Sequence, residues 1–255
     1  MEKVFIDAGK QFDFGKSSKA YAQYRDIYPE ELFDKLYQIG VGKQDSNWLD
    51  LGTGTGVIPR GLAKYGANII ATDIAKEQIE EAIELSKGID NIKYEAVAAE
   101  NIEYPQNYFD VITACQCFWY FDPNIIVPVI KKMLKPGGMF LKLYMSYMKE
   151  ESIAQDSNRL VKMINTNWNG SSAPVKDLTT HYFENPHMDT VIVDLPFTRE
   201  TWHGRMMASR GVMASMNEEQ LIQFDYEHRK MLEEKYPEEF SIKHKIFLTW
   251  YYMES

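Results

Sequence analysis

The segment WLDLGTGTG, from Trp48 to Gly56, combines residue types that suit the binding of an anionic group. Its apolar residues lead to Asp50, and glycines then alternate at Gly52, Gly54 and Gly56. Glycine at every second position lets the backbone turn sharply and approach a ligand without an intervening Cβ. The N–H groups of such a loop, and of a helix that follows it, favour an anion. The spacing therefore predicts a loop that binds a group such as a carboxylate.

A second acidic residue ends the next apolar run. Asp73 closes the segment NIIATD and lies 17 residues after Gly56. A carboxylate at about this position is typical of one that accepts hydrogen bonds from ribose hydroxyls. Capping of the following helix is the alternative. The dinucleotide pattern G-x-G-x-x-G is incomplete, because Val57 occupies the place of its last glycine.

These residues need a sheet to position them, and the chain alternates apolar strand-like and helical segments. The sequence predicts helices that start at Pro29 and at Asp122, and it predicts further helices over Val57–Tyr65, Lys76–Lys87, Thr201–Met213 and Asn217–Lys235. The expected strands are Asn47–Leu51, Asn68–Thr72, Ile92–Val97, Phe109–Ala114, Met139–Tyr144, Thr190–Leu195 and Ile246–Tyr252. Lys135–Gly138 is expected to end a helix. This rhythm predicts an α/β fold with a parallel sheet wound on both faces.

Composition narrows the class of protein. A chain of 255 residues suits one large domain or a core with an insertion. The net charge of −9 argues against a partner bound through nucleic-acid phosphates. Two cysteines, Cys115 and Cys117, imply no disulfide framework. With no signal-peptide pattern at the start and no apolar run of about 18 residues, we expect a cytoplasmic protein without a membrane anchor.

The pattern D-x-G-x-G-x-G from Asp50 to Gly56 resembles the first motif of class I S-adenosylmethionine-dependent methyltransferases. The C-terminal half resembles bacterial methyltransferases of the trans-aconitate type. The resemblance implies a Rossmann-like doubly wound sheet, mostly parallel with an antiparallel final strand, plus a helical cap insertion. We expect a single domain over residues 1–255, made of an N-terminal lid (1–30), a cofactor-binding core (31–147), the cap (148–187) and C-terminal strands and helices (188–255).

The same resemblance implies which residues bind S-adenosylmethionine. Asp50 would lie near the ammonium, the loop N–H groups near the carboxylate, and Asp73 at the ribose. Either Ala99 or Glu100 would meet the adenine amine, with Ile74 over the base; a solvated Glu100 is the alternative. The predicted cofactor set is Tyr21, Arg25, Asp50, Gly52, Thr53, Gly54, Gly56, Asp73, Ile74, Ala99, Glu100, Cys115 and Gln116.

Tyr21 and Arg25 belong to a Y-x-x-Y-R-x-x-Y-P segment that resembles the lead-in of many small-molecule methyltransferases. In those relatives the segment folds over the cofactor, where Tyr21 and Arg25 would reach the methionine carboxylate. A helix that merely packs on the core is the competing interpretation.

The acceptor side is predicted from the end of the fourth strand and from the block after the sixth. Gln116 and Trp119 are expected to line the methyl-transfer site, and His203 is the candidate base because its ordinary pKa is near ~6.5. His181 and His187 are alternatives for that role. The Asn/Asp-Pro-Pro-aromatic motif of nucleobase methyltransferases is missing at strand four, which argues further against nucleic acid.

Two arginines, Arg205 and Arg210, would clamp an acidic acceptor with bidentate hydrogen bonds, unless they form surface salt bridges. Cys115 and Cys117 without an adjacent histidine make an incomplete metal site, so no metal is expected. A thiol or carboxylate acceptor would need no base.

The predicted activity is methyl transfer from S-adenosylmethionine to an oxygen, sulfur, nitrogen or carboxylate nucleophile of a small molecule, by a monomer or homodimer. A non-catalytic regulator that binds the cofactor, a protein or RNA methyltransferase and a nicotinamide oxidoreductase remain as alternatives.

Overall fold

The computed structural model describes residues 24, 27–168, 181–213 and 215–254. They fall into two compact units. What we call the core unit contains residues 28–145, 181–191 and 246–254, and the helical unit contains residues 24, 27, 146–168, 192–213 and 215–245. Most of the predicted lid, including Tyr21 and Arg25, lies outside the described residues, and the domain boundaries stay a prediction.

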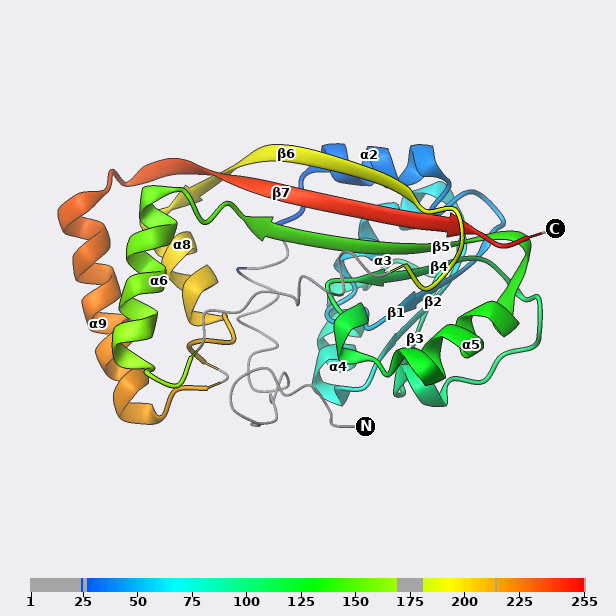
Figure 1. The fold of residues 1–255 in the computed structure, drawn as a ribbon, viewed down its shortest axis with the longest axis horizontal. Helices are drawn as coiled ribbons and strands as arrows, with labels where there is room; N and C mark the ends of the chain where they lie inside the picture. The colour runs from blue at the N-terminus through cyan, green and yellow to red at the C-terminus, as the bar shows by residue number, and fades with distance from the viewer. Residues whose placement is uncertain (1–23, 25–26, 169–180, 214, 255) are drawn as a thin grey trace. The chain divides into compact units, whose positions relative to one another are not determined.

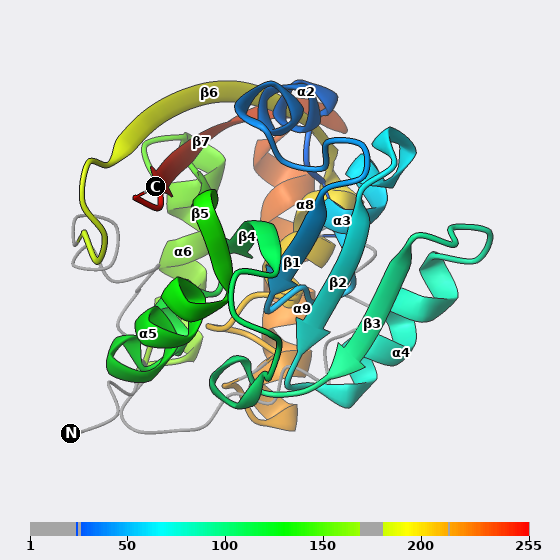
Figure 2. The same ribbon diagram turned by 90° about the vertical axis from the view of Figure 1, so that its right-hand side faces the viewer.

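The strands of the described chain form one sheet in the order β3-β2-β1-β4-β5-β7-β6. They are β1 (Asn47–Leu51), β2 (Asn68–Asp73), β3 (Ile92–Ala96), β4 (Phe109–Cys115), β5 (Leu134–Tyr147), β6 (His187–Thr198) and β7 (Glu239–Tyr252). The first five pair in parallel, whereas β7 is antiparallel to β5 (Figure 1). Figure 2 shows β5, β4, β1, β2 and β3 in this order. The predicted Rossmann-like sheet with an antiparallel final strand is confirmed.

Helices connect these strands. They are α2 (Glu30–Ile39), α3 (Val57–Leu62), α4 (Lys76–Leu85), α5 (Pro123–Met133), α6 (Ser152–Ile164), α8 (Arg199–Met207) and α9 (Glu218–Lys235), with 3-10 helices η2 (Ala63–Tyr65), η3 (Ala99–Asn101) and η4 (Phe118–Tyr120). None of those in the described part of the chain is long and apolar enough to cross a membrane.

Local chemistry explains where several helices begin. Proline at the first position of α5 follows Asp122, whose side chain accepts a hydrogen bond from the Asn124 N–H. At α9, Asn217 and Gln220 exchange both hydrogen bonds of a capping box. The sequence predicted both starts.

The core unit is built around the strands that carry the glycine loop. Ile126 and Ile130 on one side of α5 pack in a fully buried cluster with Leu49 of β1, Ile112 of β4 and Phe140 of β5. Burial of this much apolar surface makes β1 and β4 a rigid base for the residues at their carboxyl ends.

Several elements differ from their predicted bounds, most of all β5. β5 begins at Leu134 and includes Lys135–Gly138, which the sequence analysis assigned to a helix stop. The cause is tertiary pairing, because Gly137 N–H donates to Met253 O (3.1 Å) and Met253 N–H donates to Gly138 O (2.8 Å). β6 and β7 are longer than predicted, and α8 ends at Met207 rather than Met213.

Candidate active site

The loop between β1 and α3 holds three glycines with positive φ: 62° at Gly52, 58° at Gly54 and 76° at Gly56. A Cβ on Gly52 would lie 2.7 Å from Cys117 Sγ, and one on Gly56 would overlap the Tyr94 side chain. At Gly54 the nearest atom to an added Cβ would be 3.9 Å away. Gly52 and Gly56 therefore pack closely against neighbouring side chains, whereas Gly54 has room beside it among the residues that the structure describes.

Three N–H groups of this loop have acceptors within the chain. Gly54 N–H donates to Asp73 Oδ2 (2.9 Å), Thr53 N–H to Thr72 O (2.8 Å) and Gly56 N–H to Thr53 O (3.0 Å). These bonds shape the loop and orient Asp73. The contact expected between loop N–H groups and the carboxylate of a ligand stays a prediction.

Asp73 ends β2 beside the loop and is half-buried. Besides the bond from Gly54, its Oδ1 accepts from Ala75 N–H (2.9 Å), the residue before α4. Burial raises its pKa, against the lowering effect of these N–H groups. A carboxylate can accept about four hydrogen bonds, so the two N–H groups fix its orientation and leave capacity for a ligand hydroxyl.

Asp50, near the carboxyl end of β1, is 1% exposed. Its Oδ1 accepts a hydrogen bond from Thr113 Oγ1 of β4, and Thr113 accepts one from Trp48 Nε1 (2.8 Å). Burial raises the pKa of Asp50 to about 6, against the hydrogen bond from Thr113, and the charge of Asp73 adds to the rise. Two neighbouring carboxylates of which one is buried create a site that favours a cationic group.

Thr113 is a site residue that the sequence analysis missed. A threonine within the apolar strand FDVITAC was the available signal, because a buried hydroxyl needs a hydrogen-bond partner.

The predicted adenine contacts lie after β3 and β2. Ala99 is buried on η3, and Ile74 is 75% exposed directly after Asp73. Glu100 Oε1 accepts from Asp122 N–H (3.0 Å), so this acid also supports the start of α5. An exposed apolar side chain beside Asp73 suits contact with a flat ring, and the adenine assignment stays a prediction.

The segment after β4 borders the glycine loop. Cys117 Sγ donates to Leu51 O (3.0 Å), which ties the segment to β1. Gln116 has a φ of 64°, and its Nε2 donates to Met145 O (2.6 Å). Burial and the charge of Asp50 raise the pKa of the Cys115 thiol well above its ordinary value. Cys115 is therefore a protonated thiol at neutral pH.

Trp119, on η4, packs edge-on against Tyr144 with 5.4 Å between ring centroids. Its Nε1 is buried, and no hydrogen-bond acceptor reaches it within the part of the chain that the structure describes. It lines a cavity of about 80 Å³ together with Ala114, Phe118, Lys142, Leu143, Tyr144, Met188, Asp189, Thr190, Phe247, Leu248 and Thr249. The end of β4 thus combines aromatic rings with a buried, unused donor.

The other predicted acceptor residues belong to the helical unit. His203 is 2% exposed, and its ring nitrogens contact His228 Nδ1 (2.9 Å) and Asp225 Oδ1 (3.0 Å). With both nitrogens engaged, this geometry favours a structural role for His203 over that of a base. The Arg205 guanidinium is buried, with its Cζ 5.7 Å from the centre of the Tyr147 ring.

The alternative bases lie in the core unit. His181 Nδ1 is 3.0 Å from the Tyr251 hydroxyl, and the exposed His187 stacks on Trp250 with 5.5 Å between centroids. Neither histidine lines the cavity beside Trp119.

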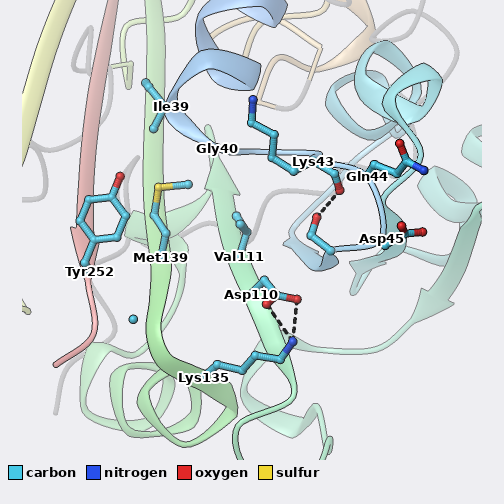
Figure 3. A pocket seen from close by; sticks show the side chains of 12 residues that line it. Ile39, Gly40, Lys43, Gln44, Asp45, Asp110, Val111, Lys135, Met139 and Tyr252 are labelled. Atoms are coloured by element: carbon cyan, nitrogen blue, oxygen red, sulfur yellow. Dashed lines mark hydrogen bonds and ion pairs between the residues drawn. The ribbon is translucent and has the colours of Figure 1, made fainter. Parts of the chain in front are cut away.

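A second pocket lies at the amino ends of β1 and β4, the opposite end of the strands from the glycine loop (Figure 3). Here Asp110 forms an ion pair with Lys135, whose Nζ lies 2.8 Å from both carboxylate oxygens. Asp110 Oδ2 also accepts from Asn47 N–H (2.8 Å). This pocket contains none of the predicted site residues.

Comparisons with known proteins show which family the core of the chain is similar to. Residues 49–141, which include the glycine loop, Asp73 and β4, match the family model described as a methyltransferase domain. A Dictyostelium discoideum protein described as a methyltransferase is 31% identical over 138 residues, 53% of this chain and 51% of its own. The ubiquinone biosynthesis O-methyltransferase of Leptothrix cholodnii is 32% identical over 126 residues, 43% of this chain and 53% of its own.

The chain thus spans about half the length of the curated relatives it matches. The crystal structure of the YcgJ protein from Bacillus subtilis matches the fold with a TM-score of 0.56 at 19% identity, covering 89% of this chain and all of that one. No match here singles out the trans-aconitate type. Residues 49–141 of this chain thus match the methyltransferase-domain family model.

Proposed function

We propose that this chain transfers the methyl group of S-adenosylmethionine to a small-molecule acceptor. The observation that carries the proposal is the pair of acids at the carboxyl ends of β1 and β2, where Asp73 accepts the Gly54 N–H and its charge acts on the buried Asp50. In open α/β sheets, ligands bind beyond the carboxyl ends of the strands. S-adenosylmethionine has an ammonium and a ribose diol, which match these two carboxylates.

Each carboxylate has a distinct task in this proposal. Asp73 accepts the ribose hydroxyls, and the N–H groups of Gly54 and Ala75 hold it in place for them. Asp50 faces the ammonium, directly or through water, and this opposite charge compensates for the burial of its carboxylate. Ile74 covers one face of the adenine.

The acceptor binds beside Trp119. The cavity there adjoins the segment whose Cys117 touches the glycine loop, so cofactor and acceptor sites share one short stretch of chain. Aromatic lining with few polar groups is usual for small-ligand sites. A volume of about 80 Å³ holds only part of an acceptor, since benzene fills a cavity of roughly 150 Å³. The buried Nε1–H of Trp119 would donate to an acceptor oxygen.

The chemistry asks little else of the protein. S-adenosylmethionine supplies a methyl carbon activated by a positive sulfur. The chain's residues align the nucleophile and exclude water. A protonated nucleophile also needs a group that accepts its proton. The roles expected from the sequence for Arg205 and Arg210, and for Tyr21 and Arg25 as a lid, stay predictions.

An acceptor screen tests this function. Thiols, carboxylates, phenols and amines are incubated with S-adenosylmethionine and the full chain, and S-adenosylhomocysteine release is measured. We expect release above the acceptor-free rate with one class, and loss of it in Asp73→Ala. Cofactor binding without release in any class would contradict the proposal and favour a non-catalytic regulator.

A second variant locates the acceptor. Trp119→Phe keeps an aromatic ring and removes the N–H, so turnover should fall while the dissociation constant of S-adenosylmethionine is unchanged. Tyr226→Phe, at a 63% exposed position on α9, is the matched control and should change neither. Unchanged turnover in Trp119→Phe would place the acceptor elsewhere.

A further inference from the structure

A line of four polar side chains, three of them buried and the fourth, Asp225, partly exposed, connects three helices of the helical unit. Asp225 Oδ1 lies 3.0 Å from His203 Nε2, and His203 Nδ1 lies 2.9 Å from His228 Nδ1. His228 Nε2 lies 2.9 Å from Ser157 Oγ. His203 belongs to α8, Asp225 and His228 to α9 and Ser157 to α6. The line is independent of the cofactor site, and the proposed function does not use it.

The positions of the protons follow from what each group is able to donate. An ionised Asp225 only accepts, so His203 Nε2 carries a proton and, in a neutral ring, Nδ1 accepts. His228 Nδ1 then donates to His203, and its Nε2 accepts from the Ser157 hydroxyl. With both histidines neutral, every hydrogen bond in the line is formed. In each of them the donor lies on the Ser157 side and the acceptor on the Asp225 side.

A second arrangement is also complete, with one more proton. The proton on His228 Nδ1 moves to His203 Nδ1, which makes His203 an imidazolium that donates to both His228 and Asp225. A proton from solvent ends on His228 Nε2, which now donates to Ser157. The Ser157 hydroxyl turns to its other acceptor, Ile153 O, at 2.7 Å. His228 stays neutral and changes tautomer.

The partner of Ser157 on α8 fits both arrangements. Trp202 Nε1 donates to Ser157 Oγ (3.0 Å), which occupies one lone pair of the hydroxyl and leaves the other for His228. Ser157 and His228 are each 0% exposed. A buried polar group that lost its partner would be costly, and neither arrangement leaves one.

The charged groups around His203 set the pH of the change. On α9, Asp225 favours the imidazolium, whereas Arg229, whose Nε lies 3.2 Å from Asp225 Oδ1, opposes it. Glu200 on α8 is paired with Arg229 and favours the imidazolium. Burial dominates and lowers the pKa of His203, and burial with the charge of His203 lowers that of His228 to about 3. The line therefore takes up its proton below the ordinary histidine range.

We propose that Ser157, His228, His203 and Asp225 form a two-state relay, which binds one proton on acidification by reversing the two hydrogen bonds that His228 makes. The helices α6, α8 and α9 keep every bond of the relay in both states. The relay is thus a pH-sensitive element of the helical unit that takes up one proton rather than two.

Nitrogen-15 NMR of the full chain with labelled histidines, recorded from pH 8 to pH 4.5, tests the relay. At pH 8 we expect the Nε2–H tautomer for His203 and the Nδ1–H tautomer for His228. On acidification His203 should become an imidazolium while His228 stays neutral and changes to Nε2–H. His244 is an internal reference, because its Nδ1 donates to Ile242 O (3.0 Å) and should keep its proton as His203 titrates. An unchanged His228 tautomer, or simultaneous charging of both rings, would overturn the relay.

Two variants at exposed positions give shifts of opposite sign. Asp225→Asn removes the charge that favours the imidazolium, so the midpoint of the His203 titration should fall by about one pH unit or more. Arg229→Gln removes the opposing charge, so the midpoint should rise. In both variants the His228 tautomer change should follow the new midpoint. A tautomer change that stays at its original pH would show that the two histidines are not coupled.

Discussion

The two ends of the parallel strands hold their acidic side chains in different ways. At the amino end of β4, Asp110 is paired with Lys135 (Figure 3), and it also accepts the Asn47 N–H. At the carboxyl end of β1, Asp50 is buried with hydroxyl partners, and its pKa rises to about 6. A paired acid stabilises the fold, whereas a buried acid with neutral partners costs free energy until a cation arrives. The comparison separates a structural edge of the sheet from a functional one.

The largest expected difference is in stability. Asp50→Asn should increase the free energy of unfolding at pH 7 to 8 by up to about 3 kcal/mol, which is what a rise from 3.8 to about 6 represents. A carboxyl group with a raised folded-state pKa destabilises the protein once it is ionised. The gain should therefore disappear as the pH falls from about 6 to about 4. Urea unfolding across this pH range measures it.

Asp110→Asn is the matched control and should have the opposite sign. Its ion pair with Lys135 is partly exposed, so we expect a loss of at most about 1 kcal/mol. If both variants destabilised the protein at pH 8, the proposed difference between the two edges would be wrong.

Cofactor affinity gives the next effect. Asp73→Ala removes a charged acceptor for the ribose hydroxyls and should weaken S-adenosylhomocysteine binding by about 1.5–3 kcal/mol. Isothermal titration calorimetry measures this loss, and Asp110→Ala should bind as the unchanged protein does. Equal affinity in a folded Asp73→Ala would leave Asp73 only its contacts with Gly54 and Ala75.

The two edges of the sheet can also be compared by one substitution at two glycines, Gly54 in the glycine loop and Gly137 in the second pocket. Gly54 and Gly137 have φ values of 58° and 73°, and both have room for a Cβ. Alanine strains the backbone at either position. Only Gly54→Ala should also weaken the cofactor, by about 1–3 kcal/mol, since its methyl group enters the space proposed for the ligand. Calorimetry on both variants measures the affinity for the cofactor. Similar affinities in the two variants would show that the cofactor does not lie beside Gly54.

The smallest effect is a pH dependence of cofactor affinity. Because Asp50 must be ionised to pair with the ammonium, affinity should rise with pH and level off above about 6. Below that value it should fall by up to about tenfold, or 1.4 kcal/mol, for each pH unit. Titrations between pH 5 and 7.5 measure the profile, and Asp50→Asn should flatten it. A slope that persists in Asp50→Asn would assign the proton to another group.

Local sequence patterns predicted the parts of the fold that neighbouring residues control. β1 was placed at Asn47–Leu51, and the capping box of Asn217 and Gln220 marked the start of α9. Strand alternation and caps depend on residues within a few positions, so they can be recognised without the fold. β5 shows the limit, because its first residues contain a proline and two glycines and become strand only by pairing with Met253.

The candidate site likewise has features that the sequence predicts and features that only the folded structure explains. By itself the sequence determined the glycine loop and its two carboxylates, because alternating glycines and the acids that end apolar strands form a local pattern. Only the tertiary structure decided that Gly54 N–H binds Asp73 and that Thr113 holds Asp50, because these partners lie 19 and 63 residues apart in the chain. It also decided that His203 contacts His228 and Asp225. Burial and hydrogen-bond partners depend on which elements pack together, and residue types alone do not contain that information.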